Sequence, residues 1–362
     1  MRRRVRVLVV DDAVAIRATV SDTLSEDPDI EVVGTAPNGR IALAKLERLT
    51  PDVVILDVEM PELDGLQTLL EIRRTHPALP VIMFSTYTER GAAATLDALS
   101  LGATDYVTKP SVTSTEGGMS AVRAELLRKV KGVAAKVLTP PPGPEGAFPT
   151  AAHVTSGHRG QGNPWLVAVG ASTGGPNALT TILGALPADF PAPVVVVQHM
   201  PPLFTRLLAR RLDAACALKV REAVDGAAVA PGDVWVARGD WHMEVERRDA
   251  GVHIRTHRQP PQHSCRPAVD VLLRSAAESY GRYALAVVLT GMGRDGLRGC
   301  EEIRARGGEV FVQDEASSVV WSMPGCIAAA GLAGRVIPVE DIANELVRHV
   351  EGDEPTRVRR GA

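Results

Sequence analysis

Short apolar runs alternate with helix-length segments along the first third of the chain. The apolar runs predict strands at residues 5–10, 30–34, 53–57, 81–85 and 104–107. Between them, apolar residues recur at helical spacing and predict helices at residues 16–24, 41–49, 66–72 and 92–101. Five strand–helix units of this size predict a five-stranded parallel sheet with helices on both faces, the (βα)5 arrangement.

A proline-rich segment separates this region from a second alternating pattern. Residues 139–144 read Thr-Pro-Pro-Pro-Gly-Pro, a proline density that blocks both helices and sheet ladders. We therefore expect a first domain at 1–130, a linker at 131–164 that is proline-rich from 139, and a second domain at 165–349. The second pattern predicts a doubly wound, mainly parallel α/β domain. Residues 350–362 are charged and are expected to form a flexible tail.

One serine stands at the apex of a glycine turn in the second region. The apolar strand that begins at Leu166 leads into Gly170-Ala171-Ser172-Thr173-Gly174, and Pro176 suits the first turn of a following helix. The spacing reads G-x-S-x-G, the pattern of a nucleophile elbow. Phosphate-binding glycine turns are the ordinary alternative, although the Walker A and G-x-G-x-x-G patterns are both missing. The local pattern alone leaves both interpretations open.

Two other predicted strands end in residues that complement a serine nucleophile. His199 falls just past the valine run 194–197, and the strand at 284–289 runs into glycines and Asp295. Alone, His199 is typical of an ordinary core or surface histidine, and Asp295 of a helix cap. Three parallel strands that deliver Ser172, His199 and Asp295 to one sheet edge predict a catalytic triad. The chain order Ser–His–Asp differs from the Ser–Asp–His order of α/β-hydrolases.

Carboxylates also gather at the predicted sheet edge of the first region. Asp11 and Asp12 end the first strand and Asp57 ends the third. A single such aspartate is usually a helix cap, but three at one edge repel one another unless a cation lies among them, and oxygen ligands of this kind suit Mg²⁺. Ser85 and Lys109 follow two further strands, where a hydroxyl and an ammonium can bind the oxygens of an aspartyl phosphate.

Charge and cysteine usage narrow the class of protein. The net charge of −3 gives no general reason to expect binding to nucleic acid or to a membrane. The apolar run at 5–10 is too short for a signal peptide or a membrane span, so we expect a cytoplasmic protein. Four scattered cysteines without a C-x-x-C pair indicate neither a zinc site nor a disulfide framework; they are Cys216, Cys265, Cys300 and Cys326.

The first domain resembles a response-regulator receiver domain, which has a flavodoxin-like fold. The resemblance rests on the motifs at residues 9–12, 56–65 and 106–110. It implies that Asp57 accepts a phosphoryl group from a sensor histidine kinase of the CheA kind. The residues that it implies for Mg²⁺ are Asp11, Asp12 and Asp57. The residues that it implies for sensing the phosphate are Ser85, Tyr106 and Lys109.

The second domain resembles the catalytic domain of the chemotaxis protein-glutamate methylesterases, the CheB family. The matching motifs lie at residues 170–176, 198–201, 263–270 and 289–296. The resemblance implies the triad Ser172, His199 and Asp295, with no cofactor in this domain. The implied substrate is a glutamate γ-methyl ester on the cytoplasmic helices of a chemoreceptor, released as methanol, and some members also deamidate receptor glutamines. Such an enzyme serves adaptation in chemotaxis or a related signalling pathway.

Four residues receive weaker assignments. Backbone N–H groups of Thr173 and Met292 are candidates for binding the oxyanion, because glycine turns let the backbone approach closely. Arg266 and Arg294 are candidates for contact with an acidic receptor surface, with a solvated or ion-paired arginine as the equal alternative. A phosphoacceptor and an esterase in one chain suggest regulation of one by the other. The hypothesis is that the unphosphorylated first domain packs over the Ser172 edge and limits access to it, and that phosphorylation of Asp57 weakens this packing.

Two other classes of protein remain as alternatives. A transcriptional response regulator requires a compact, basic DNA-binding module, whereas the second region is long, rich in strands and insufficiently basic. A receiver-linked scaffold or nucleotide-binding domain would use the glycine turn without esterase chemistry. Covalent capture of Ser172 by a serine-directed phosphonate would separate the esterase from the scaffold.

Overall fold

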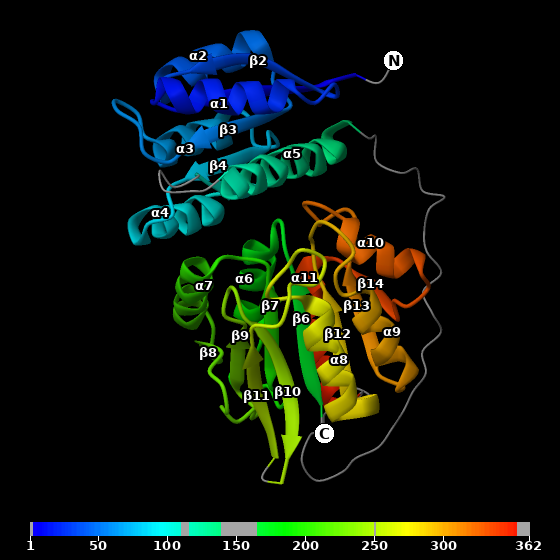
Figure 1. Cartoon of the computed structure of the whole chain (residues 1–362). Coiled ribbons are helices and arrows are strands. Elements are labelled where there is room, and N and C mark those ends of the chain that lie inside the picture. The colour runs from blue at the N-terminus through cyan, green and yellow to red at the C-terminus, as the bar shows by residue number, and fades with distance from the viewer. Residues whose placement is uncertain (1–2, 110–115, 139–164, 250, 353–362) are drawn as a thin grey trace, which may run out of the picture. The chain divides into compact units, whose positions relative to one another are not determined.

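The computed structural model describes residues 3–109, 116–138, 165–249 and 251–352. The chain divides into two compact units, residues 1–146 and 147–362 (Figure 1). The expected proline-rich linker segment 139–164 lies outside the described residues, as do residues 353–362 of the expected tail. Among the described residues, no helix is both long enough and apolar enough to span a bilayer.

The first unit is a five-stranded parallel sheet with the strand order β2-β1-β3-β4-β5. Its strands are β1 (Val5–Val10), β2 (Ile30–Ala36), β3 (Val53–Asp57), β4 (Val81–Ser85) and β5 (Asp105–Thr108). Its helices are α1 (Val14–Ser25), α2 (Gly39–Leu49), α3 (Gly65–Thr75), α4 (Glu89–Ser100) and α5 (Glu116–Leu138). The predicted flavodoxin-like (βα)5 fold is confirmed.

Helix boundaries in this unit differ from the predicted ones because polar caps precede the apolar pattern. The side chain of Asn38 accepts the Ile41 N–H at the start of α2, and that of Thr88 accepts the Gly91 N–H at the start of α4. Helix α5 continues to Leu138, so its last turns occupy the expected start of the linker.

The second unit contains a seven-stranded parallel sheet with the order β14-β13-β12-β6-β7-β9-β8 and a separate antiparallel hairpin. The sheet strands are β6 (Leu166–Ala171), β7 (Val194–Gln198), β8 (Lys219–Glu222), β9 (Asp233–Val236), β12 (Ala284–Val288), β13 (Glu309–Gln313) and β14 (Arg335–Ile337). The hairpin strands are β10 (His242–Arg248) and β11 (Gly251–His257). The doubly wound, mainly parallel α/β fold predicted for this part of the chain is confirmed.

Helices cover both faces of this sheet (Figure 1). They are α6 (Gly175–Ala185), α7 (Pro202–Ala215), α8 (Val269–Tyr280), α9 (Leu297–Ala305), α10 (Ser322–Ala329), α11 (Val339–Glu351) and the 3₁₀ turn η2 (Gly281–Tyr283). Helices α6, α7 and α11 pack together, whereas α8 packs against α9 and β10. Strands β6, β7 and β12 are completely buried, as expected for parallel strands with helices on both faces.

Strand β6 is the point at which the chain reverses its direction of winding. It pairs with β7 on one side and with β12 on the other. Loops that leave adjacent strands at such a switch point diverge to opposite faces, and the crevice between them is where ligands bind in open α/β sheets. The turn that carries Ser172 follows β6 directly, so it lies at this switch point.

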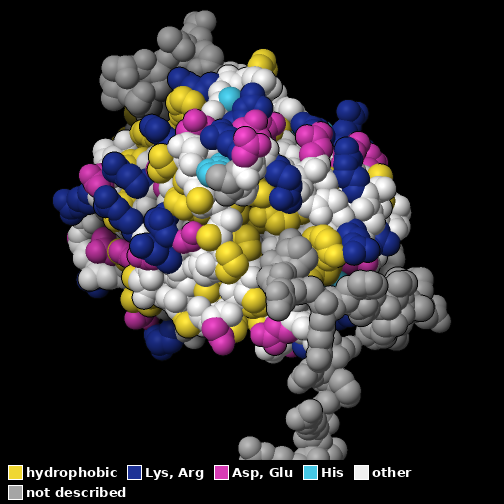
Figure 2. Space-filling view, turned by 90° about the horizontal axis from the view of Figure 1, so that it is seen from below, with side chains coloured by type: hydrophobic (Ala, Val, Ile, Leu, Met, Phe, Trp, Pro, Cys, Tyr) yellow, Lys and Arg dark blue, Asp and Glu magenta, His cyan; other side chains and the backbone are white. Residues whose placement is uncertain are grey.

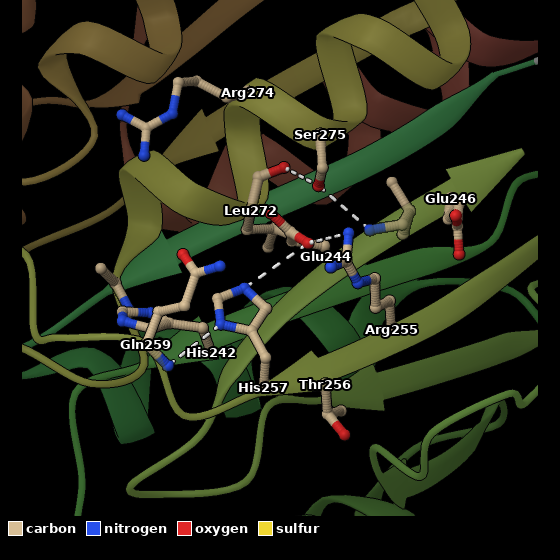
Figure 3. A network of polar contacts seen from close by, with 12 residues as sticks. His242, Glu244, Glu246, Arg255, Thr256, His257, Gln259, Leu272, Arg274 and Ser275 are labelled. Atoms are coloured by element: carbon tan, nitrogen blue, oxygen red, sulfur yellow. Dashed lines mark hydrogen bonds and ion pairs between the residues drawn. The ribbon is translucent and has the colours of Figure 1, made fainter.

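Polar contacts fasten α8 to the hairpin (Figure 3). The hydroxyl of Ser275 on α8 accepts the Val245 N–H of β10 at 3.0 Å and donates to the Leu272 carbonyl at 2.8 Å. Within the hairpin, the Glu244 carboxylate lies 3.4 Å from an Arg255 guanidinium nitrogen and 3.5 Å from His257 Nε2. The Ser275 contact joins α8 to β10, and the first residues of α8 reach the candidate active site.

The molecular surface carries charges of both signs. On the face drawn in Figure 2, Lys and Arg side chains lie among Asp and Glu side chains, with apolar side chains between them. This mixture agrees with the small net charge of the chain.

Candidate active site and phosphoacceptor site

Ser172 is held between three elements. Its N–H donates to the Thr290 carbonyl at 3.1 Å, in the loop after β12. Its own carbonyl accepts the Gly175 N–H at 2.8 Å, where α6 begins, and Gln198 Nε2 at 2.9 Å, at the end of β7. The serine backbone therefore links the carboxyl ends of β6, β7 and β12.

Two glycines allow these close approaches. A Cβ atom on Gly291 would lie 2.9 Å from Ser172 Cβ and 2.4 Å from Met323 Sδ, and one on Gly175 would lie 2.0 Å from Gln198 Oε1. Real Cβ atoms do not approach neighbours this closely, so a side chain at either position would force a neighbour to shift. The serine turn is packed tightly against both neighbouring loops.

His199 and Asp295 are hydrogen-bonded to each other. His199 Nε2 lies 2.8 Å from Asp295 Oδ2, and the His199 side chain is only 11% exposed. The His199 N–H donates to the carbonyl of Ala171, the residue before Ser172, at 3.1 Å. The structure therefore brings the three predicted triad residues to one rim, as the strand ends predicted.

The second ring nitrogen of His199 faces a thiol. Cys265 Sγ lies 3.7 Å from His199 Nδ1. Within the described residues, no hydrogen bond joins the Ser172 hydroxyl to the His199 ring. Catalytic hydrogen bonds often form only when substrate is bound, so Nδ1 remains the nitrogen that can receive the serine proton.

Asp295 does not cap the helix that follows it. Its carboxylate instead accepts the Val269 N–H at 2.7 Å and the Asp270 N–H at 2.9 Å, at the start of α8. The Asp270 carboxylate in turn accepts the Gly296 N–H at 3.0 Å and the Gly299 N–H at 2.7 Å, at the start of α9. His263 Nε2 lies 2.9 Å from the other oxygen of Asp270.

The electrostatics of the pair favour an ionised Asp295. Burial tends to raise the pKa of Asp295, but the hydrogen bond from His199 and the two backbone N–H groups lower it below its usual value. Burial tends to lower the pKa of His199, but the contacts with Asp295 and Cys265 raise it to about 10. Asp295 thus stabilises the protonated ring that forms when His199 takes a proton.

The oxyanion candidates lie in the turns beside Ser172. Among the described residues, the N–H groups of Thr173 and Met292 donate to no protein acceptor. The Thr290 hydroxyl donates to the Thr173 carbonyl at 2.9 Å and fixes that turn against the loop after β12. Both backbone donors therefore remain available to a substrate oxygen.

The two arginine candidates differ in their surroundings. Arg266 Nε donates to Asp240 Oδ1 at 2.9 Å, and its Nη1 donates to the Gln259 carbonyl at 3.1 Å. The hydrogen bond from Arg266 holds the pKa of Asp240 below its usual value. Arg294 is exposed in the loop before α9. Arg266 thus has a structural partner, whereas Arg294 faces solvent.

The carboxylates of the first unit also converge. Side-chain oxygens of Asp11, Asp12 and Asp57 lie within 4.8 Å of one another. Lys109 Nζ lies 2.7 Å from Asp11 Oδ2 and 2.8 Å from Asp57 Oδ2. Burial raises the pKa of Asp57 to about 6, against the opposing effect of Lys109. A set of oxygen donors this compact fits a hard divalent cation such as Mg²⁺.

The remaining receiver candidates lie on the neighbouring strands. Ser85 ends β4, and its buried hydroxyl donates to the Gly91 carbonyl of α4 at 3.0 Å. The Lys109 N–H donates to the Ser85 carbonyl at 2.7 Å and thereby joins the two loops. Tyr106 is 5% exposed, and Lys129 Nζ lies 4.7 Å from the centre of its ring. Ser85 and Lys109 thus lie at the same edge as Asp57.

Sequence reasoning missed the roles of Cys265, Asp270 and His263. All three lie within the motif at 263–270, which indicated a family but no contacts. Cys265 meets His199 at a sequence separation of 66 residues, and Asp270 meets Gly296 at a separation of 26. The local signal at Asp295 indicated a cap on the helix that follows it, not the contacts with the start of α8 that the structure shows.

Comparison with known proteins supports the family resemblance of both halves of the chain. Residues 7–116 match the response regulator receiver domain family, and residues 167–346 match the CheB methylesterase family. A protein-glutamate methylesterase/protein-glutamine glutaminase of Trichodesmium erythraeum is 49% identical over 95% of this chain and 99% of its own length. This chain belongs to the CheB methylesterase family. Its order of domains and its predicted catalytic class follow that family.

Other members of the CheB family lead to the same conclusion. The protein of the same description from a Nocardioides species is 50% identical over 99% of both chains. The crystal structure of the Thermotoga maritima CheB methylesterase catalytic domain is 43% identical, with a TM-score of 0.51. It covers 51% of this chain and 98% of that chain. The alternatives of a nucleotide-binding or scaffold domain are therefore not favoured.

Proposed function

We propose that this chain hydrolyses glutamate γ-methyl esters on chemoreceptors, with Ser172, His199 and Asp295 as its catalytic triad and phosphorylation of Asp57 as its control. The hydrogen bond between His199 and Asp295, beside Ser172 at the switch point of the sheet, is the observation that carries the triad. The family to which the chain belongs supports the ester as substrate.

Hydrolysis proceeds through an acyl-enzyme. Because Asp295 holds Nε2 of His199, Nδ1 takes the proton as the Ser172 oxygen attacks the ester carbonyl. The backbone N–H groups of Thr173 and Met292 bind the oxyanion of the tetrahedral intermediate. The protonated ring then gives its proton to the leaving oxygen, and methanol departs. Water, deprotonated by His199, attacks the acyl group and releases the glutamate and Ser172.

The same residues support hydrolysis of a glutamine side chain. The curated relatives carry the description protein-glutamine glutaminase as well as methylesterase. In that reaction His199 would protonate the amide nitrogen, which leaves as ammonia in place of methanol, and the same acyl-enzyme would remain. We therefore propose that both reactions share one site, with receptor glutamines as the second substrate.

Phosphorylation acts on the first unit. We propose that a sensor histidine kinase of the CheA kind supplies the phosphoryl group to Asp57. When bound by Asp11, Asp12 and Asp57, Mg²⁺ would offset the negative charge of the phosphoryl oxygens. Lys109, whose Nζ lies 2.8 Å from Asp57 Oδ2, and Ser85 would bind those oxygens, and Ser85 would give up its bond to the Gly91 carbonyl to do so. The Tyr106 side chain would then change its orientation as Ser85 moves.

The proposed domains are a receiver at 1–130, a linker at 131–164, a catalytic domain at 165–349 and a tail at 350–362, working in the cytoplasm. The exposed side chain of Arg294 is the better placed of the two arginines to meet an acidic receptor surface, since Arg266 is paired with Asp240.

Release of methanol from a methylated receptor tests the proposed function. The full chain is assayed with and without acetyl phosphate and Mg²⁺. We expect methanol release in both conditions and a higher rate with the phosphodonor. No methanol above the enzyme-free control in either condition would contradict the assigned reaction.

A further inference from the structure

Cys265 and His199, two residue types that bind metals in proteins, lie in contact with each other in addition to the contacts of the proposed triad. Cys265 lies in the loop between β11 and α8, which is closed by two backbone hydrogen bonds between Gln262 and Cys265, of 3.0 and 2.8 Å. Cys265 is a free, partly buried cysteine. The thiol points at the ring nitrogen that Asp295 leaves open.

The spacing of the two atoms fits a tetrahedral metal. With a Zn–N bond of about 2.0–2.1 Å and a Zn–S bond of about 2.3 Å at a tetrahedral angle, nitrogen and sulfur lie about 3.6 Å apart. The observed separation of Cys265 Sγ and His199 Nδ1 is 3.7 Å. The distance between the two atoms therefore matches that of two ligands of one zinc ion.

Asp295 completes the arrangement. Histidines that bind a metal through one ring nitrogen usually donate the other N–H to a carboxylate, which fixes the ring and strengthens the ligand. His199 Nε2 makes this contact with Asp295 Oδ2 at 2.8 Å. Ligand atoms of His199, Cys265 and Asp295 all lie within 4.8 Å of one another. The carboxylate–histidine–thiol row thus has the donors that a zinc-type ion prefers.

We propose that Cys265 Sγ and His199 Nδ1 bind a thiolate-seeking divalent metal of the Zn²⁺ type, which inhibits the esterase by occupying its base nitrogen. Binding forms one metal–sulfur and one metal–nitrogen bond, and the thiol proton and the proton that the charged ring carries on Nδ1 both pass to solvent. Water fills the remaining positions. The metal-binding part stands on the geometry alone, while the inhibitory part rests on the proposed function.

Cobalt tests the binding directly, because a thiolate bound to Co²⁺ gives a ligand-to-metal charge-transfer absorption that carboxylate ligands do not give. Full-length protein is titrated with Co²⁺ in excess Mg²⁺, which fills the carboxylate cluster of the first unit. We expect the absorption band in the wild type and in Cys216→Ser, and its loss in Cys265→Ser. Cys216 is the matched control because it is also free and partly buried. Absence of the band in the wild type, or its persistence in Cys265→Ser, would overturn the site.

Zinc inhibition tests the functional part. Methanol release is measured against Zn²⁺ concentration, and each protein is normalised to its own rate in chelator. We expect Cys265→Ser to require at least about tenfold more Zn²⁺ for half-inhibition than the wild type and Cys216→Ser. Equal sensitivity of all three would overturn the inhibitory role. A cobalt band in a protein that releases no methanol would support the metal site and count against the proposed function alone.

Discussion

Asp270 and Asp295 each bind the start of the helix beside the other. The Asp295 carboxylate accepts the N–H of Asp270 at 2.9 Å, and the Asp270 carboxylate accepts the N–H of Gly296, the residue after Asp295, at 3.0 Å. Both side chains are almost fully buried. Because each carboxylate stabilises the backbone that carries the other, the position of Asp295 relative to His199 depends on Asp270.

Replacement of Asp270 tests this dependence. Asp270→Asn weakens two hydrogen bonds to backbone N–H groups, and hydrogen bonds to charged groups contribute about 1.5–3 kcal/mol each. We expect a lower melting temperature and a fall in kcat of about tenfold or more, with the pH profile of kcat/KM shifted as Asp295 moves from His199. His263→Gln, which changes only the exposed partner of Asp270, is the control. An unchanged pH profile in a folded Asp270→Asn protein would show that Asp270 has no positioning role.

Replacement of Asp295 tests the electrostatic support of His199. The reaction requires the neutral ring, and the contacts with Asp295 and Cys265 raise the pKa of His199 to about 10, so the wild-type rate should climb as the pH rises into the alkaline range. Removing the carboxylate charge lowers that pKa. In Asp295→Asn the rise of kcat/KM with pH should therefore occur at lower pH. The limiting rate should fall by about 10³- to 10⁴-fold. The measurement is kcat/KM against pH, and a climb at the same pH in both proteins would contradict this account.

Gly291 tests how tightly the serine turn is packed. A Cβ at this position would lie 2.9 Å from Ser172 Cβ and 2.4 Å from Met323 Sδ, so we expect Gly291→Ala to shift the serine turn and the loop after β12 apart. We expect a fall in kcat of about tenfold or more, since small misplacements of reacting groups cost rate heavily. Gly184→Ala on α6 is the control, because a Cβ there would have only an ordinary contact, at 3.7 Å from the Ala215 carbonyl. Equal kinetics of the two variants would show that the turn is adaptable.

Asp57 tests the regulatory assignment. Asp57→Asn removes the carboxylate that we propose as the phosphoryl acceptor, so acetyl phosphate with Mg²⁺ should no longer raise the rate of methanol release. Asp97→Asn, at an exposed position on α4, should respond as the wild type does. The ratio of rates with and without the phosphodonor is the measurement. If Asp57→Asn and the wild type gave the same ratio, regulation by the phosphodonor would not act through Asp57.

Local sequence predicted most strands and part of the site. Buried parallel strands such as β6 and β7 are continuous apolar runs, and the residues just past their ends fall at one edge, which located Ser172 and His199. The predicted helices α2 and α4 begin a few residues after the observed ones. Their caps, Asn38 and Thr88, are polar and lie outside the apolar pattern from which the helices were predicted. The contact of Cys265 with His199 has no local signal, since two unrelated loops bring it about. A C-x-x-C pattern indicates only cysteines that are close in sequence, whereas Cys265 and His199 lie 66 residues apart.

Ser172 is the direct test of the central claim that a serine, a histidine and an aspartate at one rim perform the hydrolysis. Methanol release from a methylated receptor is compared for the wild type, Ser172→Ala and the control Thr181→Ala, an exposed hydroxyl on the helix that follows the serine turn. The account predicts a loss of about 10⁴-fold or more for Ser172→Ala and little change for Thr181→Ala. A loss of less than about tenfold in a folded Ser172→Ala protein would contradict it.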